Sequence, residues 1–151
     1  MTESSIRTEE GCLKRAVSMK RTAELLWNQG DDWFAVCYFY SAYHMARAAI
    51  MTDPIFEDLA RLQKKALWLT LEDRYVTAHQ GRVTPGQPRK AGVNDVVRLL
   101  YPDIAAEYVR LHMASVEVRY QEGLQAIHRN SAEQDFLAVQ SAYLERRLIA
   151  E

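Results

Sequence analysis

The run from Asp31 to Ala49 constrains the fold more than any other part of the chain. After two acids it is almost entirely apolar or aromatic, and it contains neither Gly nor Pro. Such a length is too great for a strand and ordinary for a helix. Ser41, His44 and Arg47 make the run too polar for a membrane span. We therefore predict a buried helix over residues 31–50 and take it as the axis of the domain.

At 100° per residue, this predicted helix carries distinct stripes of side chains. One stripe consists of small residues, which let a neighbouring helix approach closely: Ala35, Ala42, Ala46 and Ala49. Another combines aromatic and polar residues: Trp33, Cys37, Tyr40, His44 and Arg47. A helix that is apolar nearly all round is either surrounded by other helices or has a core face and a partner face.

Composition sets the class of protein. With 151 residues, 48% hydrophobic and 26% charged, the chain is predicted to be one globular domain over residues 1–151, with 1–7 frayed. A net charge of −1 argues against coating nucleic acid by charge alone, although a local basic patch stays possible. Cys12 and Cys37 fit free thiols in a reducing cytosol. The polar N-terminus is no signal peptide, so we expect a cytoplasmic protein without a membrane span.

Capping signals and apolar periodicity predict the helices on either side of this axis. The first helix begins near Thr8, and Gly30 is a suitable residue to follow its C-cap. Asp31 is then expected to cap the central helix. The Asp53-Pro54 pair repeats the start signal for a third helix that continues to about Glu72–Tyr75.

The second half of the chain shows the same helical period. A short helix is predicted from Asn94 to Tyr101, and a longer one from Asp103 to about Glu122. The Ser131–Gln134 segment has a capping-box pattern, which begins a last helix ending near Ala150. No window alternates with period two, so the predicted fold is an all-α, up-down bundle of four to five helices.

Residues 76–92 interrupt the helical pattern with a long loop rich in Gly and Pro. The loop is locally basic, carrying Arg82, Arg89 and Lys90 and no acid. Loops of this length in small domains are usually functional or disordered. It is either a mobile surface loop or a contact for an anion or nucleic acid.

Four segments resemble the HEPN superfamily. The run Phe39–Ile50 is similar to its second-helix signature, in the branch with a Tyr-Tyr-Ala-x-Phe-His-x-Ala-Arg-Ala-like helix. A His-containing loop and short helix (His79–Tyr101), an Arg-containing segment (Ala114–Tyr120) and a final helix (Ala132–Leu148) follow in the same order. The likeness spans about residues 10–148, with the long loop as an apparent insertion.

This resemblance implies a HEPN-like bundle, often dimeric, from prokaryotic or phage systems that act on RNA or nucleotides. Its catalytic members are metal-independent ribonucleases in which an Arg and a His are separated by four to six intervening residues. The His moves protons and the Arg stabilises charge on the phosphate. Here Arg119 stands at the expected place, but Tyr120 follows it and the next His, His128, is too far. Arg74 and His79 match the spacing, yet they lie where a helix enters the loop, so no rigid element fixes them.

Two functional hypotheses follow. The first is a non-catalytic HEPN-like module that binds RNA, a nucleotide or a partner protein, in a defence or toxin–antitoxin system, with little or no RNA cleavage. Its groove residues are Tyr40, His44, Arg47, Arg119 and Tyr120, with loop contacts from Arg82, Arg89 and Lys90. The alternative is a ribonuclease toxin that uses Arg74 and His79, or Arg119.

Simpler readings of the same residues stay open. His44 fits a satisfied core histidine, and Arg47 fits a paired charge at the helix end. His112 and His128 are expected to be isolated at the surface and, with His79, have no metal-ligand spacing. No metal or cofactor is therefore predicted. We expect a homodimer, because a helix apolar on three sides needs more cover than a few short neighbours provide, and a nucleotidyltransferase-type antitoxin is a possible partner.

Overall fold

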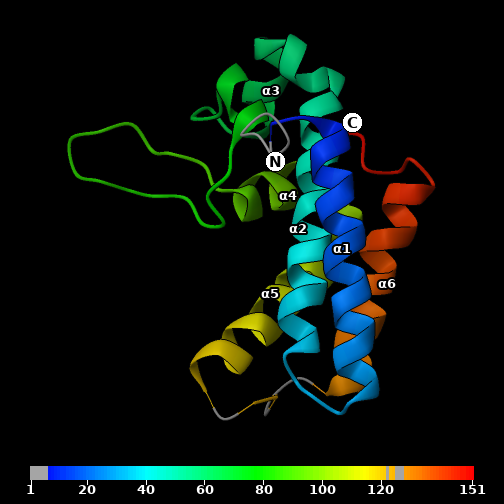
Figure 1. The fold of residues 1–151 in the computed structure, drawn as a ribbon. Helices are drawn as coiled ribbons and strands as arrows, with labels where there is room; N and C mark the ends of the chain where they lie inside the picture. Colours follow the sequence, from blue (N-terminus) through cyan, green and yellow to red (C-terminus); the bar gives the residue numbers. More distant parts are fainter. Residues whose placement is uncertain (1–6, 122, 125–127) are drawn as a thin grey trace.

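The computed structural model describes residues 7–121, 123–124 and 128–151, and these residues form an all-helical bundle (Figure 1). The described part contains six α-helices: α1 (Glu9–Asn28), α2 (Phe34–Thr52), α3 (Leu59–Lys65), α4 (Val93–Leu100), α5 (Pro102–Tyr120) and α6 (Arg129–Leu144). It also contains two short 3₁₀ helices, η2 (Pro54–Glu57) and η3 (Leu71–Tyr75). The predicted all-α class is confirmed, with more helices than the four to five expected. The predicted fraying of residues 1–7 concerns positions that, except for Arg7, lie outside the described residues.

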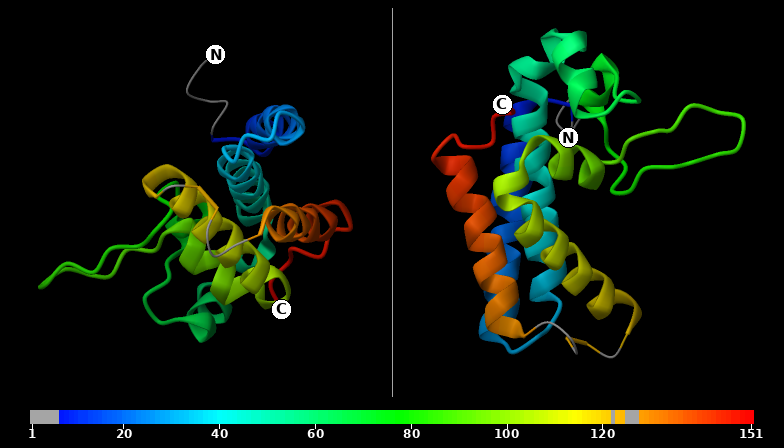
Figure 2. Two further views of the ribbon diagram at one scale, coloured as in Figure 1. Left: turned by 90° about the horizontal axis from the view of Figure 1, so that it is seen from below. Right: turned by 180° about the vertical axis from the view of Figure 1, so that it is seen from behind.

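Helix α2 is the centre of the bundle. It packs against α1, α4, α5 and α6, and the view from below shows α1, α5 and α6 arranged around it (Figure 2). Fifteen of its 19 residues are buried, which confirms the prediction that this run forms the most buried helix. Within the described residues, no helix has both the length and the apolar character needed to cross a membrane.

The beginning of α2 differs from the prediction. The helix starts at Phe34, and Asp31 does not act as its N-cap. The carboxylate of Asp31 instead accepts a hydrogen bond from the Trp33 N–H at 2.9 Å, and its carbonyl accepts one from the Phe34 N–H at 3.1 Å. Asp side chains favour such local turns over the first turn of a helix. The acid therefore shapes the turn between α1 and α2, after Gly30 has ended α1 with a φ of 71°.

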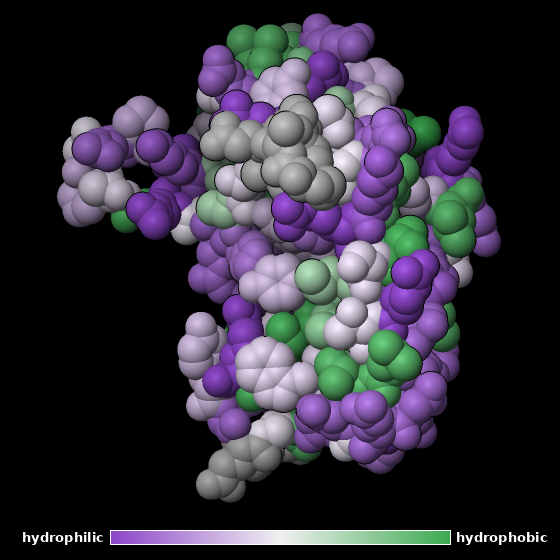
Figure 3. All heavy atoms as spheres, viewed as in Figure 1, coloured by the Kyte–Doolittle hydropathy of each residue, from purple (hydrophilic) through white to green (hydrophobic). Residues whose placement is uncertain are grey.

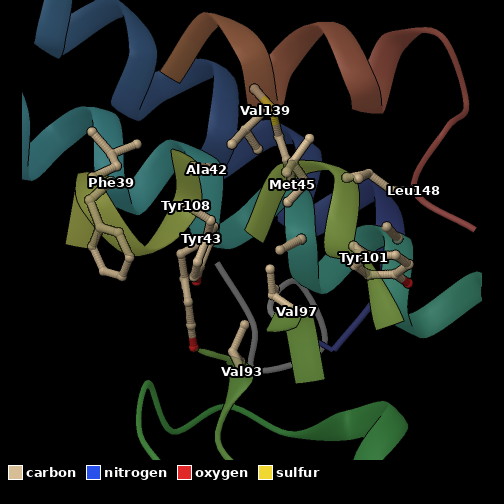
Figure 4. Packing of buried hydrophobic residues seen from close by; sticks show 14 of the residues in the cluster. Phe39, Ala42, Tyr43, Met45, Val93, Val97, Tyr101, Tyr108, Val139 and Leu148 are labelled. Atoms are coloured by element: carbon tan, nitrogen blue, oxygen red, sulfur yellow. The ribbon is translucent and has the colours of Figure 1, made fainter. Parts of the chain in front are cut away.

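Two faces of α2 form the core. Toward α1, the Ser41 hydroxyl donates a hydrogen bond to the Ala16 carbonyl at 2.7 Å. Toward α6, the ring of Tyr38 stacks on Phe136 with centroids 4.3 Å apart. The small Ala42 is fully buried in this core (Figure 4). Because α2 finds this cover within one chain, the argument that its apolar surface requires a second copy is wrong.

The predicted third helix is broken into three short pieces. Asp53 caps η2 by accepting from the Ile55 N–H at 3.0 Å, and Asp58 then caps α3 by accepting from the Arg61 N–H at 3.1 Å. Asp58 has an extended backbone, with φ of −133°, so a continuous helix cannot pass through it. The second capping acid explains why the apolar period from Ile55 onward did not produce one long helix.

The last helix is shifted toward the N-terminus. It begins at Arg129, where the His128 side chain accepts from the Asn130 N–H, so the predicted capping box at Ser131 is not its start. It ends at Leu144, well before Ala150. Arg146 adopts a left-handed conformation with φ of 57°, which turns the chain back across the bundle. α5 ends at Tyr120, near the predicted end at Glu122, which lies outside the described residues.

Asp53 ties the end of α2 to two distant segments. Its side chain is 2% exposed. The Oδ2 atom accepts hydrogen bonds from the Tyr101 hydroxyl at 2.9 Å and from the Ala150 N–H at 2.8 Å. Tyr101 connects α4 to α5, and Ala150 belongs to the segment after α6. One buried carboxylate therefore connects the C-terminal end of α2 to the start of α5 and to the segment after α6.

We predict that Asp53→Ala lowers the free energy of unfolding by at least about 3 kcal/mol, because it leaves two or three buried donors without acceptors. Urea denaturation measures this change. Asp58→Ala is the matched control, since it removes an exposed helix-capping acid and should cost about 1 kcal/mol. Equal effects of the two substitutions would contradict the role given to Asp53.

Candidate functional site

The third face of α2 is covered by an irregular segment and by the short elements η3 and α4 instead of a long helix. The Tyr43 hydroxyl donates a hydrogen bond to the Thr77 carbonyl. One turn further on, Arg47 Nε donates to the Val76 carbonyl at 3.1 Å. These two bonds hold the chain after η3 against α2, where packing by a long helix is absent.

The first turn of α4 fixes the next two residues. The Val93 N–H donates to the Ala78 carbonyl at 2.7 Å, and the Asn94 N–H donates to the His79 carbonyl at 2.9 Å. The backbone of His79 is therefore bound to the start of a helix. The expectation that no rigid element fixes His79 is wrong, because the Gly/Pro-rich part of the loop begins only after it.

Gly92 makes this arrangement possible by close backbone contact. A Cβ atom at Gly92 would collide with backbone atoms of Gln80 and Gly81. Directly beyond, the Arg82 and Lys90 backbones pair through two hydrogen bonds of 2.9 and 3.0 Å. These contacts close the base of the loop.

The rest of the loop projects away from the bundle as a narrow excursion (Figures 1 and 2). Its tip is a turn in which the Gln87 N–H donates to the Thr84 carbonyl at 3.0 Å, with Gly86 at a φ of 78°. Residues 82–90 are all exposed. The predicted loop contacts Arg82, Arg89 and Lys90 accordingly lie at its base, not at its tip.

Four polar side chains gather around Phe39 where this anchored segment reaches α2 and α5, and we call them the His79 cluster: Tyr40, His79, His112 and Arg119. The ring of His79 lies edge-on to Tyr40, with centroids 5.2 Å apart. Arg119 Nη1 lies 3.4 Å from the Tyr40 hydroxyl. His112 packs against the neighbouring Phe39 ring at 4.9 Å.

Charge and burial keep both imidazoles neutral. Burial lowers the pKa of His79, and the positive charge of Arg119 lowers it further. Burial likewise lowers the pKa of His112, with contributions from His79 and Arg119. A cluster with one fixed positive charge and two neutral imidazoles offers hydrogen-bond donors and acceptors to an anion without requiring a proton to be taken up first.

An exposed aromatic side chain extends the cluster at its outer edge. The Arg119 guanidinium lies 5.4 Å from the Tyr120 ring centroid and 6.0 Å from that of Tyr40. The side chain of Tyr120 is 75% exposed. Of the five predicted groove residues, these three are brought together.

His44 and Arg47 lie deeper on the same face of α2. Arg47 is 3% exposed and donates to the Val76 carbonyl, with its Nη1 3.6 Å from Cys12 Sγ. His44 is 8% exposed, and its Nδ1 has no hydrogen-bond partner among the described residues. Arg47 thus supports the anchored segment, and His44 is a core side chain beneath the cluster.

Arg74 and His79 have different surroundings, although their spacing matches the ribonuclease signature. Arg74 Nη2 donates to the Asp53 carbonyl at 3.0 Å and lies 3.8 Å from Glu57 Oε1. Its guanidinium also lies over the Phe56 ring at 5.9 Å. Arg74 is therefore part of the packing at the end of α2, while His79 faces Arg119.

His112 is the site residue that sequence reasoning missed. It was expected to be isolated at the surface, but it is half-buried. It packs against Phe39, and His79 lowers its pKa. The available signal was its position two helical turns before Arg119, which places both on one face of α5. His128, by contrast, is exposed at the start of α6, as expected.

No protein-family model, no curated protein and no solved structure matches the chain. Within the residues that the structure describes, no group of three or more His, Cys, Asp or Glu side chains is arranged to hold a metal ion.

We predict that stability falls between pH 6.5 and 4 because of His44. Burial lowers its pKa from 6.5 to about 4, with further contributions from Arg47 and Arg15. In this range the unfolded chain binds a proton that folded His44 does not, so the free energy of unfolding should decrease by about 3 kcal/mol as the pH falls. Urea denaturation at several pH values measures the slope. His44→Gln should make the slope shallower and leave the part that comes from His79 and His112, and an unchanged slope in that variant would exclude His44 as a cause.

Proposed function

We propose that the protein is a HEPN-like module that binds RNA through the phosphate backbone, with the His79 cluster as its binding site. One observation carries the proposal. Arg119 contacts Tyr40, which packs against His79, and it lowers the pKa of His112, while its guanidinium lies over the exposed Tyr120 ring. Arg is well suited to phosphate because its planar guanidinium presents several N–H donors.

The aromatic residues support a nucleic-acid ligand over a free anion. Bases of single-stranded RNA stack on exposed Tyr rings and on guanidinium planes. Tyr120 is exposed, and Arg119 lies over its ring. A strand whose phosphate contacts Arg119 can place a base on Tyr120. Because the overall charge is −1, the electrostatic attraction of RNA comes from this local site and not from the protein surface as a whole.

Neutral imidazoles favour binding over catalysis. Cleavage of RNA by two histidines needs one neutral ring as base and one protonated ring as acid. The pKa values of His79 and His112 are both lowered, so at neutral pH the base is present and the acid is scarce. This agrees with the sequence-based expectation of little or no cleavage.

A metal-independent ribonuclease is the second candidate, and one observation favours it. His79 lowers the pKa of His112, and the positive charge of Arg119 lowers the pKa of both imidazoles. A bound phosphate would raise the pKa of either imidazole and so supply the missing acid. In this form of the candidate His79 and His112 transfer the protons, and Arg119 takes the charge-stabilising role given to Arg74, which is bound to Asp53 and Glu57.

The HEPN resemblance supports the biological setting that we propose. It is a prokaryotic or phage defence or toxin–antitoxin system, in which a nucleotidyltransferase-type antitoxin is a possible partner. A nucleotide in place of RNA would use the same Arg119 contact.

We predict that a fluorescent single-stranded RNA binds the protein and that Arg119→Gln weakens binding about tenfold, as expected for loss of one phosphate contact. The slope of log affinity against log salt should become shallower by about one. Fluorescence anisotropy at several salt concentrations measures both.

Lys64→Gln on the exposed surface of α3 removes one positive charge and is the control, which should bind like the parent. The same samples, kept in EDTA, are resolved on a denaturing gel. Cleavage that disappears in His79→Ala and in His112→Ala would establish the ribonuclease instead. Absence of binding and cleavage in the parent protein would refute both candidates.

We also propose that the protein forms a homodimer through the outer face of α1. Figure 3 shows apolar side chains on the face of the molecule that carries this helix. Val17 and Leu25 are 55% and 60% exposed, and Val17 lines a shallow groove that also includes Glu9 and Arg21. In an antiparallel two-fold pairing of α1 helices, Glu9 of one copy would approach Arg21 of the other.

Val17→Asp is predicted to convert the dimer to a monomer, because it places a charge in the centre of the apolar face. Light scattering at tens of micromolar, a concentration suited to a micromolar or tighter dimer by order of magnitude, measures the mass. Leu67→Asp is the control, since Leu67 is also exposed but lies after α3. A monomeric parent protein would contradict the dimer.

A further inference from the structure

A second polar pocket adjoins the His79 cluster. It has a volume of about 330 Å³ and lies between the base of the loop, α4 and α5. Its polar lining residues are Gln80, Arg89, Asn94, Asp95, Arg98 and His112. His112 belongs to both the pocket and the cluster, so the two sites share a wall. Pockets of this size accept small ligands or parts of larger ones.

The pocket carries a net positive charge. Asp95 is 6% exposed and accepts hydrogen bonds from the Gly92 N–H at 2.9 Å and from Arg98 Nη2 at 2.6 Å. Arg89 Nη2 lies 3.7 Å from the same carboxylate oxygen as Arg98. One carboxylate thus holds two guanidiniums, and one positive charge is left uncompensated.

Both arginines are oriented by their surroundings. The Arg89 guanidinium lies over the Trp68 ring at 4.3 Å, and Arg98 is bound to Asp95. Each side chain remains about half exposed, at 43% and 56%, so N–H donors face the solvent. Fixed guanidiniums with free donors are the usual means of binding phosphate.

We infer that this pocket is a second phosphate-binding site, which makes the ligand a single RNA strand with more than one phosphate instead of a mononucleotide. The inference rests on the proposed function and extends it, because one strand passing over His112 would contact Arg119 with one phosphate and Arg98 with another.

The spacing of residues along α5 shows that such a strand needs more than one phosphate. Val109 lines the pocket, His112 follows one turn later, and Arg119 lies two turns beyond that. At 1.5 Å per residue, Val109 and Arg119 are about 15 Å apart along the helix. A single phosphate group cannot contact both ends.

The experiment is a series of oligouridylates from two to six nucleotides, with binding measured by NMR chemical-shift titration of the full chain. In the parent protein, affinity should rise about tenfold once the strand reaches the second site. Arg98→Gln should abolish this rise and leave the affinity for the dinucleotide unchanged. Arg119→Gln should weaken binding at every length.

Arg110→Gln is the matched control. Arg110 forms an ion pair with Asp135 at 2.8 Å, and the two are 51% and 7% exposed, close to the 56% and 8% of Arg98 and Asp95. The variant removes the same charge elsewhere on the bundle and should keep the rise with length. If Arg110→Gln loses it equally, general attraction and not the pocket is responsible, and the inference fails.

The remaining outcomes separate the inference from the proposed function. If the dinucleotide binds and lengthening adds nothing, the second site is refuted and the RNA-binding function stands. If no oligonucleotide binds the parent protein at any length, the proposed function itself is refuted. Arg98→Lys provides a check on folding, because it keeps the charge beside Asp95 and should retain part of the rise.

Discussion

The burial of α2 is the constraint on which the rest of the structure depends. A helix with this many apolar and aromatic side chains must be covered on all sides, and the long helices α1, α5 and α6 cover only two faces. α1 takes one face through Ser41 and Phe34, and α5 and α6 take the second through aromatic contacts. The third face is left to short elements and a segment without regular structure, and the polar groups gather there.

This division explains why structural and functional polar residues lie so close together. Irregular backbone over a buried helix needs hydrogen-bond partners, and Tyr43 and Arg47 provide them. The same side of α2 contributes Tyr40 to the His79 cluster, about one turn before Tyr43 and two turns before Arg47. Residues that hold the segment in place and residues that are available to a ligand are therefore neighbours on one helix, and Tyr40 is the one that contacts Arg119 Nη1 at 3.4 Å.

The sequence was sufficient for features that depend on long periodic patterns. The position and burial of α2, the two helices from Val93 to Tyr120 and the non-helical loop all follow from runs of apolar residues and from Gly and Pro. It was insufficient where a single local hydrogen bond decides, as at Asp58, which divides a predicted helix. It also failed for His112, whose neighbours come from α2 and from the loop, because contacts between distant segments leave no periodic signal. The grouping of Tyr40, Arg119 and Tyr120 was expected, while the anchoring of His79 by α4 was not.

The closed base of the loop separates two parts of the chain that would otherwise move together. The backbone pairing of Arg82 with Lys90 and the contact at Gly92 fix the segment that presents His79. The tip at residues 84–88 is therefore not needed to hold this segment in place. Exposed tips of this kind accept insertions. A fluorophore or a short peptide tag could therefore be inserted there to report on the neighbouring surface, and natural variation in the length of this tip would leave the bundle and its cluster intact.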